Sequence, residues 1–168
     1  MVEKVGYEEL FKIGMSFDTF LSTASEEEKE KIATITKVIK ISDELVEKIE
    51  KLDQEYNFLL SAEPWCPYVR ATLPVLNKMT ELNPKIKLKI ITEGRGFMFL
   101  REKLEISEES YVIPTLAVLD KNFDFVAKYV GRPSKYRKIG FDIVKEKYFT
   151  GHRSDDIVEE ILERIEKR

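Results

Sequence analysis

The chain has 168 residues, of which 43% are hydrophobic and 35% are charged, and its formal net charge is −3. This length supports one sizeable hydrophobic core, so we expect a single domain over residues 1–168. The mixed charges do not provide the single-signed surface that nucleic-acid or membrane-surface binding usually requires, so we expect neither partner. One cysteine cannot form an internal disulfide. Because the sequence also shows no signal segment and no run of about 18 apolar residues, we expect a cytoplasmic protein.

Residues 1–55 have the apolar spacing of several helices and are expected to form a helical N-terminal extension. Their first apolar stretch is interrupted by Gly14 and Asp18, which predicts two short helices rather than one long helix. Ser25 and Glu28 then have the spacing of a capping box, in which each side chain accepts a hydrogen bond from the other residue's backbone N–H. The predicted helices of the extension lie within residues 7–21, from residue 25 to about residue 39, and after a cap at Ser42.

At Tyr56 the pattern changes to alternating strands and helices, so residues 56–168 are expected to form an α/β core. Tyr56–Ser61 is predicted to be a buried strand, and the turn Pro64–Val69 leads from it into a helix that contains Pro74. The further predicted elements are an edge strand at 85–91, a short helix at 97–104, a hairpin of strands at 113–119 and 123–130, a helix at 134–149 that Gly140 interrupts, and a final amphipathic helix capped by Ser154.

The turn Pro64–Val69 places the only thiol of the chain, Cys66, at the start of a helix. The unpaired backbone N–H groups and the positive end of the helix dipole stabilise a thiolate there, so attack on a disulfide is feasible. The alternative is that Cys66 is a small buried apolar residue, which is the usual role of a lone cysteine. We favour a reactive cysteine because Trp65, Pro67 and a more distant proline, Pro114, accompany it.

Three features in chain order resemble the thioredoxin-like superfamily: Trp65–Cys66 at a strand-to-helix turn, Pro74 in the following helix, and Ile113–Thr115 opening an antiparallel hairpin. The helical extension and the turn Gly131–Pro133 are similar to those of a group of bacterial and archaeal thioredoxin-like proteins. The resemblance covers about residues 56–168. It implies a three-layer α/β/α fold with a central mixed sheet of about four strands.

The same resemblance implies where a substrate binds. Pro114 should be in the cis configuration beside Cys66, and the backbone of Ile113 should pair with an extended segment of the substrate. Trp65 should flank the thiol. The resemblance thus implies that the substrate is bound by Trp65, Pro67, Tyr68, Ile113, Pro114 and Thr115.

Two departures from the superfamily restrict this chemistry. Val69 occupies the position of the second cysteine, and Leu59 or Leu60 occupies the position of the buried acid that assists thiol exchange. Glu63 could act as a base, but a solvated glutamate in a turn is the favoured interpretation. A dithiol cycle within the chain is impossible, so we expect a thiol-disulfide oxidoreductase that acts through Cys66 alone. Its partner would be a disulfide-containing protein or a low-molecular-weight thiol, and an external thiol would resolve the mixed disulfide.

Two other functions remain open. The chain could be a non-catalytic module that holds an extended peptide between Trp65 and Ile113, and fold alone does not separate this function from catalysis. A weaker alternative is an iron–sulfur cluster that Cys66 residues of two subunits share with external thiols. We predict no protein metal site, because His152 is the only histidine and cannot form a cysteine–histidine cluster.

The sequence predicts no cofactor either, and it does not indicate how many copies of the chain assemble. The segment Gly94–Gly96 lacks the third glycine of a dinucleotide fingerprint and the ending of a phosphate-binding loop, so it is expected to be a turn. Basic residues around Tyr136 could contact an anionic partner or the carboxylate of glutathione, although a solvated helix face is the favoured interpretation. These basic residues are Arg132, Lys135, Arg137 and Lys138.

Overall fold

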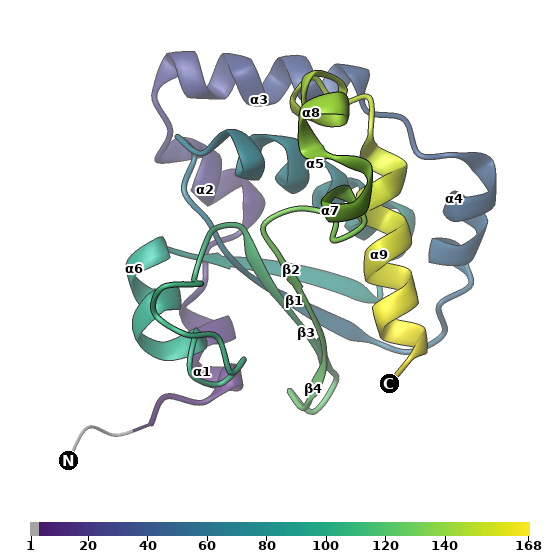
Figure 1. The fold of residues 1–168 in the computed structure, drawn as a ribbon. Helices are drawn as coiled ribbons and strands as arrows, with labels where there is room; N and C mark the ends of the chain where they lie inside the picture. Colours follow the sequence, from purple (N-terminus) through teal and green to yellow (C-terminus); the bar gives the residue numbers. More distant parts are fainter. Residues whose placement is uncertain (1–3) are drawn as a thin grey trace.

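The computed structural model describes residues 4–168, which contain a four-stranded mixed sheet in the order β2-β1-β3-β4 (Figure 1). β1 runs parallel to β2 and antiparallel to β3, and β3 and β4 form the predicted antiparallel hairpin. β2 lies at one edge of the sheet, as its alternating lysines predict. The strands are β1 (Tyr56–Ser61), β2 (Ile86–Ile91), β3 (Thr115–Asp120) and β4 (Phe125–Val130).

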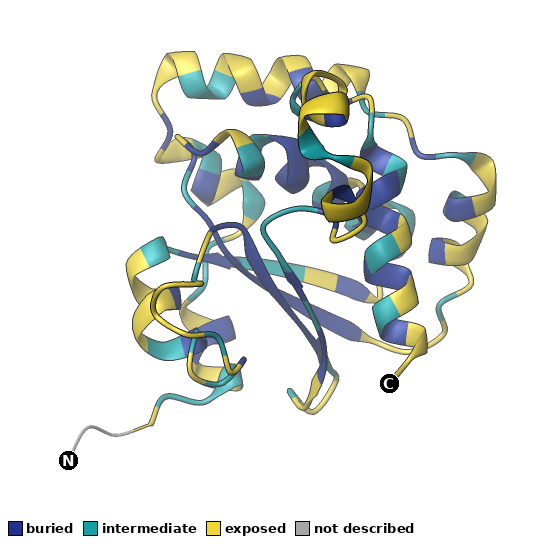
Figure 2. Ribbon diagram, viewed as in Figure 1, coloured by how far each residue is buried: buried dark blue, intermediate teal, exposed yellow. Residues whose placement is uncertain are grey.

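Helices cover both faces of this sheet and give the three layers of the predicted thioredoxin-like α/β/α fold (Figure 1). Successive residues of a strand point to opposite faces, so Phe58 and Leu60 of β1 join one buried cluster and Leu59 joins the other. β1 is therefore buried along its whole length (Figure 2). The larger cluster includes residues of α2 (Phe17–Ser22), α4 (Asp43–Glu50), α5 (Pro67–Leu82), α8 (Phe141–Phe149) and α9 (Ser154–Glu166), and the smaller cluster includes residues of α1 (Tyr7–Ile13) and the π-helix η1 (Gly96–Leu100).

The N-terminal helices form as predicted and pack against both faces of the sheet. Two short helices, α1 and α2, replace one long helix, and α3 (Glu26–Val38) lies against α5. The capping box of α3 is present: the Ser25 side chain accepts from the Glu28 N–H at 3.1 Å, and the Glu28 carboxylate accepts from the Ser25 N–H at 2.8 Å. Between α1 and α2, Met15 exchanges two backbone hydrogen bonds with Ile90 of β2. The extension therefore covers part of the sheet edge that β2 would otherwise expose.

Two predicted helix starts differ in detail from the structure. Ser154 is the first residue of α9 rather than its N-cap, a position that Arg153 holds, and the buried Ser154 hydroxyl donates to the Gly151 carbonyl at 3.1 Å. Ser42 does occupy the N-cap of α4, but its side chain makes no capping hydrogen bond. Its backbone N–H instead donates to the Asp155 carboxylate at 2.9 Å, which ties α4 to the start of α9.

Two further predicted helices are shorter than expected. The predicted helix at 134–149 consists of α7 (Tyr136–Ile139) and α8, which meet at Gly140, a residue whose φ angle of 91° interrupts the helix. The predicted helix at 97–104 is instead α6 (Glu93–Arg95) followed by η1 and turns, so Gly94–Gly96 is helical rather than the expected turn. None of the helices in the described part of the chain is long and apolar enough to cross a membrane.

Candidate functional site

The thiol lies where β1 ends and α5 begins, in the predicted order of strand, turn, cysteine and helix. Cys66 is the N-cap residue of α5 and keeps an extended backbone, with φ −83° and ψ 122°. Pro67 follows at the first helical position, where its missing N–H costs no hydrogen bond. The guanidinium of Arg70, one turn into the helix, donates to the carbonyl oxygens of Trp65 at 2.8 Å and Pro64 at 3.2 Å. These bonds fix the turn that presents Cys66.

The loop before β3 contacts this thiol. The Ile113–Pro114 peptide bond is cis, and the Cys66 Sγ atom donates to the Ile113 carbonyl oxygen at 3.8 Å. Two hydrogen bonds hold the loop in place: the Thr115 hydroxyl donates to the Val112 carbonyl at 2.6 Å, and a backbone N–H from the end of β4 donates to the Pro114 carbonyl at 2.7 Å. The fold therefore brings Cys66 together with Ile113 and Pro114, as the sequence resemblance implies.

The side chains around the thiol differ sharply in exposure. Cys66 is only 5% exposed, whereas the adjacent Trp65 is 54% exposed and offers an apolar surface beside the thiol. Val69 is fully buried in the first turn of α5, and Leu59 and Leu60 are fully buried in β1. The thiol thus lies in an apolar environment just beneath the surface.

Aromatic rings pack against the side of α5 that follows the thiol. The Tyr68 ring meets the Phe149 ring edge-on at a centroid distance of 5.1 Å and stacks on Phe141 at 5.9 Å. One helical turn further along α5, the Thr72 hydroxyl lies 3.3 Å from the buried Tyr148 hydroxyl. Burial raises the pKa of Tyr148 to about 12, so this hydroxyl stays protonated at physiological pH. These contacts anchor α8 to the helix that carries Cys66.

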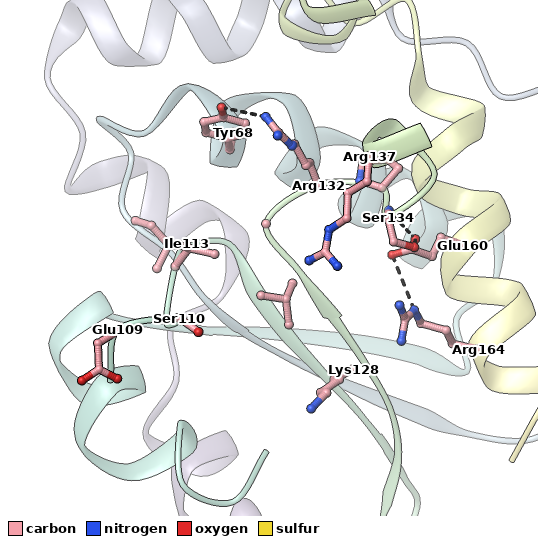
Figure 3. Close-up of a pocket in the computed structure, with 14 residues that line it drawn as sticks. Tyr68, Glu109, Ser110, Ile113, Lys128, Arg132, Ser134, Arg137, Glu160 and Arg164 are labelled. Atoms are coloured by element: carbon pink, nitrogen blue, oxygen red, sulfur yellow. Dashed lines mark hydrogen bonds and ion pairs between the residues drawn. The ribbon is translucent and has the colours of Figure 1, made fainter. Parts of the chain in front are cut away.

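A pocket of about 590 Å³ opens beside the loop that contacts the thiol (Figure 3). Tyr68 and Ile113 form its wall on the side of the thiol. Arg132 lies in this wall with its guanidinium 3.8 Å from the centre of the Phe141 ring, and it donates to the Tyr68 hydroxyl at 3.4 Å. The charged residues that line the pocket are Glu109, Lys128, Arg132, Arg137, Glu160 and Arg164.

The comparison with known proteins agrees with this geometry. A family model described as thioredoxin matches residues 14–147, which is most of the chain. The chain belongs to the thioredoxin family. The match begins inside the helical extension, so α2, α3 and α4 are part of the family pattern and not an addition to it.

Two solved structures similar to this thioredoxin-family chain are described without an enzymatic activity. A protein of unknown function from Pseudomonas aeruginosa is 28% identical, with 97% of this chain and 98% of that chain covered and a TM-score of 0.90. An HIV epitope scaffold is 30% identical, with 98% and 99% covered and a TM-score of 0.88. No curated protein matches the chain.

Two sequence interpretations need correction in this thioredoxin-family structure. Glu63 is not a solvated turn residue: it is partly buried, and its carboxylate accepts the backbone N–H of Glu93 at 2.8 Å, at the start of α6. Arg137 and Lys138 are exposed on α7, as a solvated helix face predicts, but Arg132 lies before the helix, is half-buried and lines the pocket together with Arg137. The ammonium of Lys135, from the same group, instead forms ion pairs with the carboxylates of Asp156 at 2.5 Å and Glu159 at 3.3 Å.

Sequence reasoning missed two basic residues of the pocket. Lys128 comes from β4 and Arg164 from α9, and nothing in their local sequence distinguishes them from surface lysines and arginines. Only the position of Lys128 could have indicated a role at the site, because Lys128 lies on the second strand of the hairpin that follows Pro114. In the described residues 4–168, no group of three or more acidic, histidine or cysteine side chains is arranged to hold a metal ion.

Proposed function

We propose that this thioredoxin-family protein performs thiol-disulfide exchange through Cys66 alone. The observation that carries the proposal is the position of the only thiol, at the N-terminus of α5 with its Sγ atom 3.8 Å from the Ile113 carbonyl oxygen. Free N–H groups in the first turn of a helix and the positive end of its dipole favour a thiolate. In the mixed disulfide Cys66 carries no proton to donate, so the Ile113 carbonyl oxygen is then available to an N–H of the substrate.

The exchange consists of two steps. The Cys66 thiolate attacks one sulfur of a substrate disulfide, the sulfur–sulfur bond breaks, and the other sulfur leaves as a thiolate that takes up a proton. The thiolate of an external thiol then attacks the substrate sulfur in the mixed disulfide, which frees Cys66 as a thiolate and forms a new disulfide. Val69 cannot supply this second thiol from within the chain.

The partners and the compartment follow from this need for an external thiol. The first partner is a disulfide-containing protein or a low-molecular-weight disulfide, and the second is a free thiol. Free thiols are abundant in the reducing cytoplasm, so we place the protein there. The protein itself needs no cofactor for either step.

A second candidate function is binding without turnover, and the low exposure of Cys66 favours it. A thiol that is 5% exposed is poorly accessible to a bulky disulfide unless the turn moves. In this candidate, exposed Trp65 and the backbone of Ile113 hold an extended peptide by strand-like pairing.

A turnover assay with and without the thiol separates the two candidates. The substrate is a peptide that carries a glutathione adduct, and excess reduced glutathione serves as the external thiol. We expect Cys66→Ser to lower the enzyme-dependent rate by at least about a hundredfold, the order of loss seen when a nucleophile is removed. Mass spectrometry should show a disulfide adduct on the wild-type chain only. Equal rates for the two proteins would leave binding as the function.

A further inference from the structure

The pocket beside the thiol carries a local excess of positive charge in a chain whose net charge is −3. Its lining holds four basic side chains and two acidic ones. A concave surface with an excess of one sign concentrates ligands of the opposite sign. The basic side chains are Lys128, Arg132, Arg137 and Arg164, and the acidic ones are Glu109 and Glu160.

The two acidic residues neutralise only part of this charge. The Glu160 carboxylate accepts the backbone N–H of Ser134 at 2.7 Å and also the Ser134 hydroxyl, and it lies 3.5 Å from the Arg164 guanidinium. Glu109 lies at the opposite end of the pocket, beside Ser110 (Figure 3). Glu160 therefore pairs with Arg164, and the Lys128 ammonium donates to the Leu104 carbonyl oxygen at 2.7 Å, so the charge available to an anionic ligand comes from Arg132 and Arg137.

Arg137 is the basic residue best placed to meet such a ligand. Within residues 4–168 its guanidinium makes no ion pair and no side-chain hydrogen bond, and its side chain extends toward the middle of the pocket (Figure 3). Arg132 likewise has no carboxylate partner in the described chain, because Tyr68 and the Phe141 ring hold it. Guanidinium groups bind carboxylates through two parallel hydrogen bonds.

The pocket adjoins the site of the proposed exchange reaction, although Cys66 itself does not line it. Ile113 lines it, and the carbonyl oxygen of the same residue lies 3.8 Å from the Cys66 Sγ atom. Tyr68, two residues after the thiol, forms another part of the wall. A volume of about 590 Å³ falls in the range of small-molecule sites, roughly 300–1,000 Å³. The pocket therefore has room for a ligand of a few carbon atoms beside the loop that contacts the thiol.

We propose that this pocket binds the carboxylate of a small disulfide whose sulfur reacts with Cys66. The inference rests on the proposed exchange function and names its substrate class, a low-molecular-weight carboxylated disulfide. In the first step the bound half forms the mixed disulfide with Cys66, and the other half leaves as a thiolate that takes up a proton. In the second step the thiolate of an external thiol attacks the bound half, frees Cys66 and carries the carboxylate out of the pocket.

Three disulfides of similar size and different charge test the proposal. They are 3,3′-dithiodipropionate, which is anionic, hydroxyethyl disulfide, which is neutral, and cystamine, which is cationic. The rate of adduct formation on Cys66 is measured for each at low salt and divided by the rate for a free cysteine peptide. We expect the normalised rate to fall from the anionic to the neutral to the cationic compound. An equal normalised rate for all three would overturn the proposal.

A matched pair of variants locates the effect in the pocket. Arg137→Gln and Lys138→Gln remove the same charge from neighbouring exposed positions of α7, but only Arg137 lines the pocket. We expect Arg137→Gln to slow the anionic disulfide about fivefold, the upper effect of one exposed ion pair, and to leave the neutral one unchanged. Lys138→Gln should change neither rate. Equal losses in the two variants would show a general charge effect and would contradict the pocket.

A binding measurement separates the pocket from the reaction. The thioether 3,3′-thiodipropionate cannot react with a thiol, and its affinity for the Cys66→Ser protein is measured by calorimetry, with and without Arg137→Gln. If the thioether binds and Arg137→Gln weakens this binding, the pocket proposal is supported, even when no disulfide modifies Cys66. A failure of every disulfide to modify Cys66 would contradict the exchange function alone. If the thioether does not bind while hydroxyethyl disulfide modifies Cys66, the exchange function stands and the pocket proposal is wrong.

Discussion

The turn that carries the thiol and the basic pocket beside it are built in opposite ways. The turn is apolar, with Cys66 and Val69 buried beside exposed Trp65, and hydrogen bonds from the Arg70 side chain and to the loop of Pro114 hold its backbone and its thiol. The pocket is open and charged, and long side chains from β4, α7 and α9 line it. In the proposed function the rigid part performs the exchange and the adaptable part selects the substrate. Changes in the turn should therefore affect every substrate, and changes in the pocket should affect only charged ones.

The largest expected effect on activity is the gain of a dithiol cycle in Val69→Cys. Residue 69 lies three positions after Cys66 in the first turn of α5, a spacing that places side chains on one helix face. The introduced thiol would attack the mixed disulfide on Cys66, release the substrate thiol and close an internal disulfide that dithiothreitol reduces. We expect reduction of insulin disulfides to rise about tenfold or more over the wild-type rate, because the resolving step becomes intramolecular.

Val69→Ala is the control for this gain, since it opens the same buried position without adding a thiol. It should leave insulin reduction at the wild-type rate. If the two variants behave alike, residue 69 is not positioned to resolve a disulfide on Cys66. The rigid geometry ascribed to the turn would then be wrong.

The largest expected effect on stability tests how tightly the end of β1 is packed. A Cβ atom at Gly96 would overlap the hydroxyls of Ser61 and Tyr111, which share a hydrogen bond of 2.5 Å. We expect Gly96→Ala to lower the free energy of unfolding by about 2–3 kcal/mol, the usual cost of overpacking a filled site. Urea denaturation measures this loss. Burial raises the pKa of Tyr111 to about 12, so the hydrogen bond to Ser61 persists through the neutral pH range.

Gly94→Ala is the matched control, because a Cβ atom there meets nothing within 4 Å. Its free energy of unfolding should be unchanged or higher by up to about 1 kcal/mol, since alanine restricts the unfolded chain more than glycine does. Similar destabilisation by both substitutions would show that the close approach of η1 to β1 does not explain the loss.

The third effect concerns the anchor of α7, the helix that carries Arg137 into the pocket. The Asp156 carboxylate accepts the Tyr136 hydroxyl at 2.6 Å and pairs with Lys135 at 2.5 Å and Arg153 at 2.7 Å. Burial alone would raise the pKa of Asp156, but the hydrogen bonds from Lys135 and Tyr136 outweigh it and lower that pKa. We expect Asp156→Asn to cost about 2 kcal/mol at pH 7, as for a lost hydrogen bond to a charged group.

The lowered pKa of Asp156 also sets the sign of a pH effect. A carboxyl whose pKa is lower in the folded than in the unfolded state stabilises the fold above its unfolded value, about 3.9. That contribution disappears as the pH falls through the lower folded value. The stability difference between the wild type and Asp156→Asn, measured by urea denaturation, should therefore shrink as the pH falls below about 4. A difference that stays constant from pH 7 to pH 2 would contradict the ion-paired role of Asp156.

Much of the fold was predictable because apolar runs and capping residues act locally. Tyr56–Ser61 was predicted with the bounds of β1, since its run of apolar residues is flanked by polar ones. Ser25 and Glu28 form the capping box that their spacing predicts. The start of α9 was predicted less well, because Ser154 turns its hydroxyl back to the Gly151 carbonyl instead of capping the helix. Whether a serine side chain caps a helix or bonds to a preceding carbonyl depends on packing, which the local sequence does not determine.

The candidate site also has a part that local sequence predicts and a part that depends on packing. Cys66 and Pro114 were identified because each belongs to a short motif, and the sheet then brings the two motifs together. Arg132 and Arg137 belong to a basic segment that the sequence shows, but Lys128 and Arg164 share no motif with it, since their convergence depends on how β4, α7 and α9 pack. The sequence therefore predicted the position of the proposed chemistry and two of the basic residues beside it, but not the pocket that these residues line.

The smallest expected effect is a gain in rate with an anionic substrate. Glu160→Gln removes one of the two negative charges that line the pocket, while the amide oxygen can still accept from the Ser134 N–H. We expect the normalised rate with 3,3′-dithiodipropionate to rise about twofold, because a charge beside a binding site changes the rate of association with a charged ligand. The rate with hydroxyethyl disulfide should not change. A gain is more informative than a loss, since damage to the fold would lower both rates, whereas a selective rise requires the anion to lie near residue 160. An unchanged rate with the anionic disulfide would place the bound carboxylate away from α9 and nearer to Arg132.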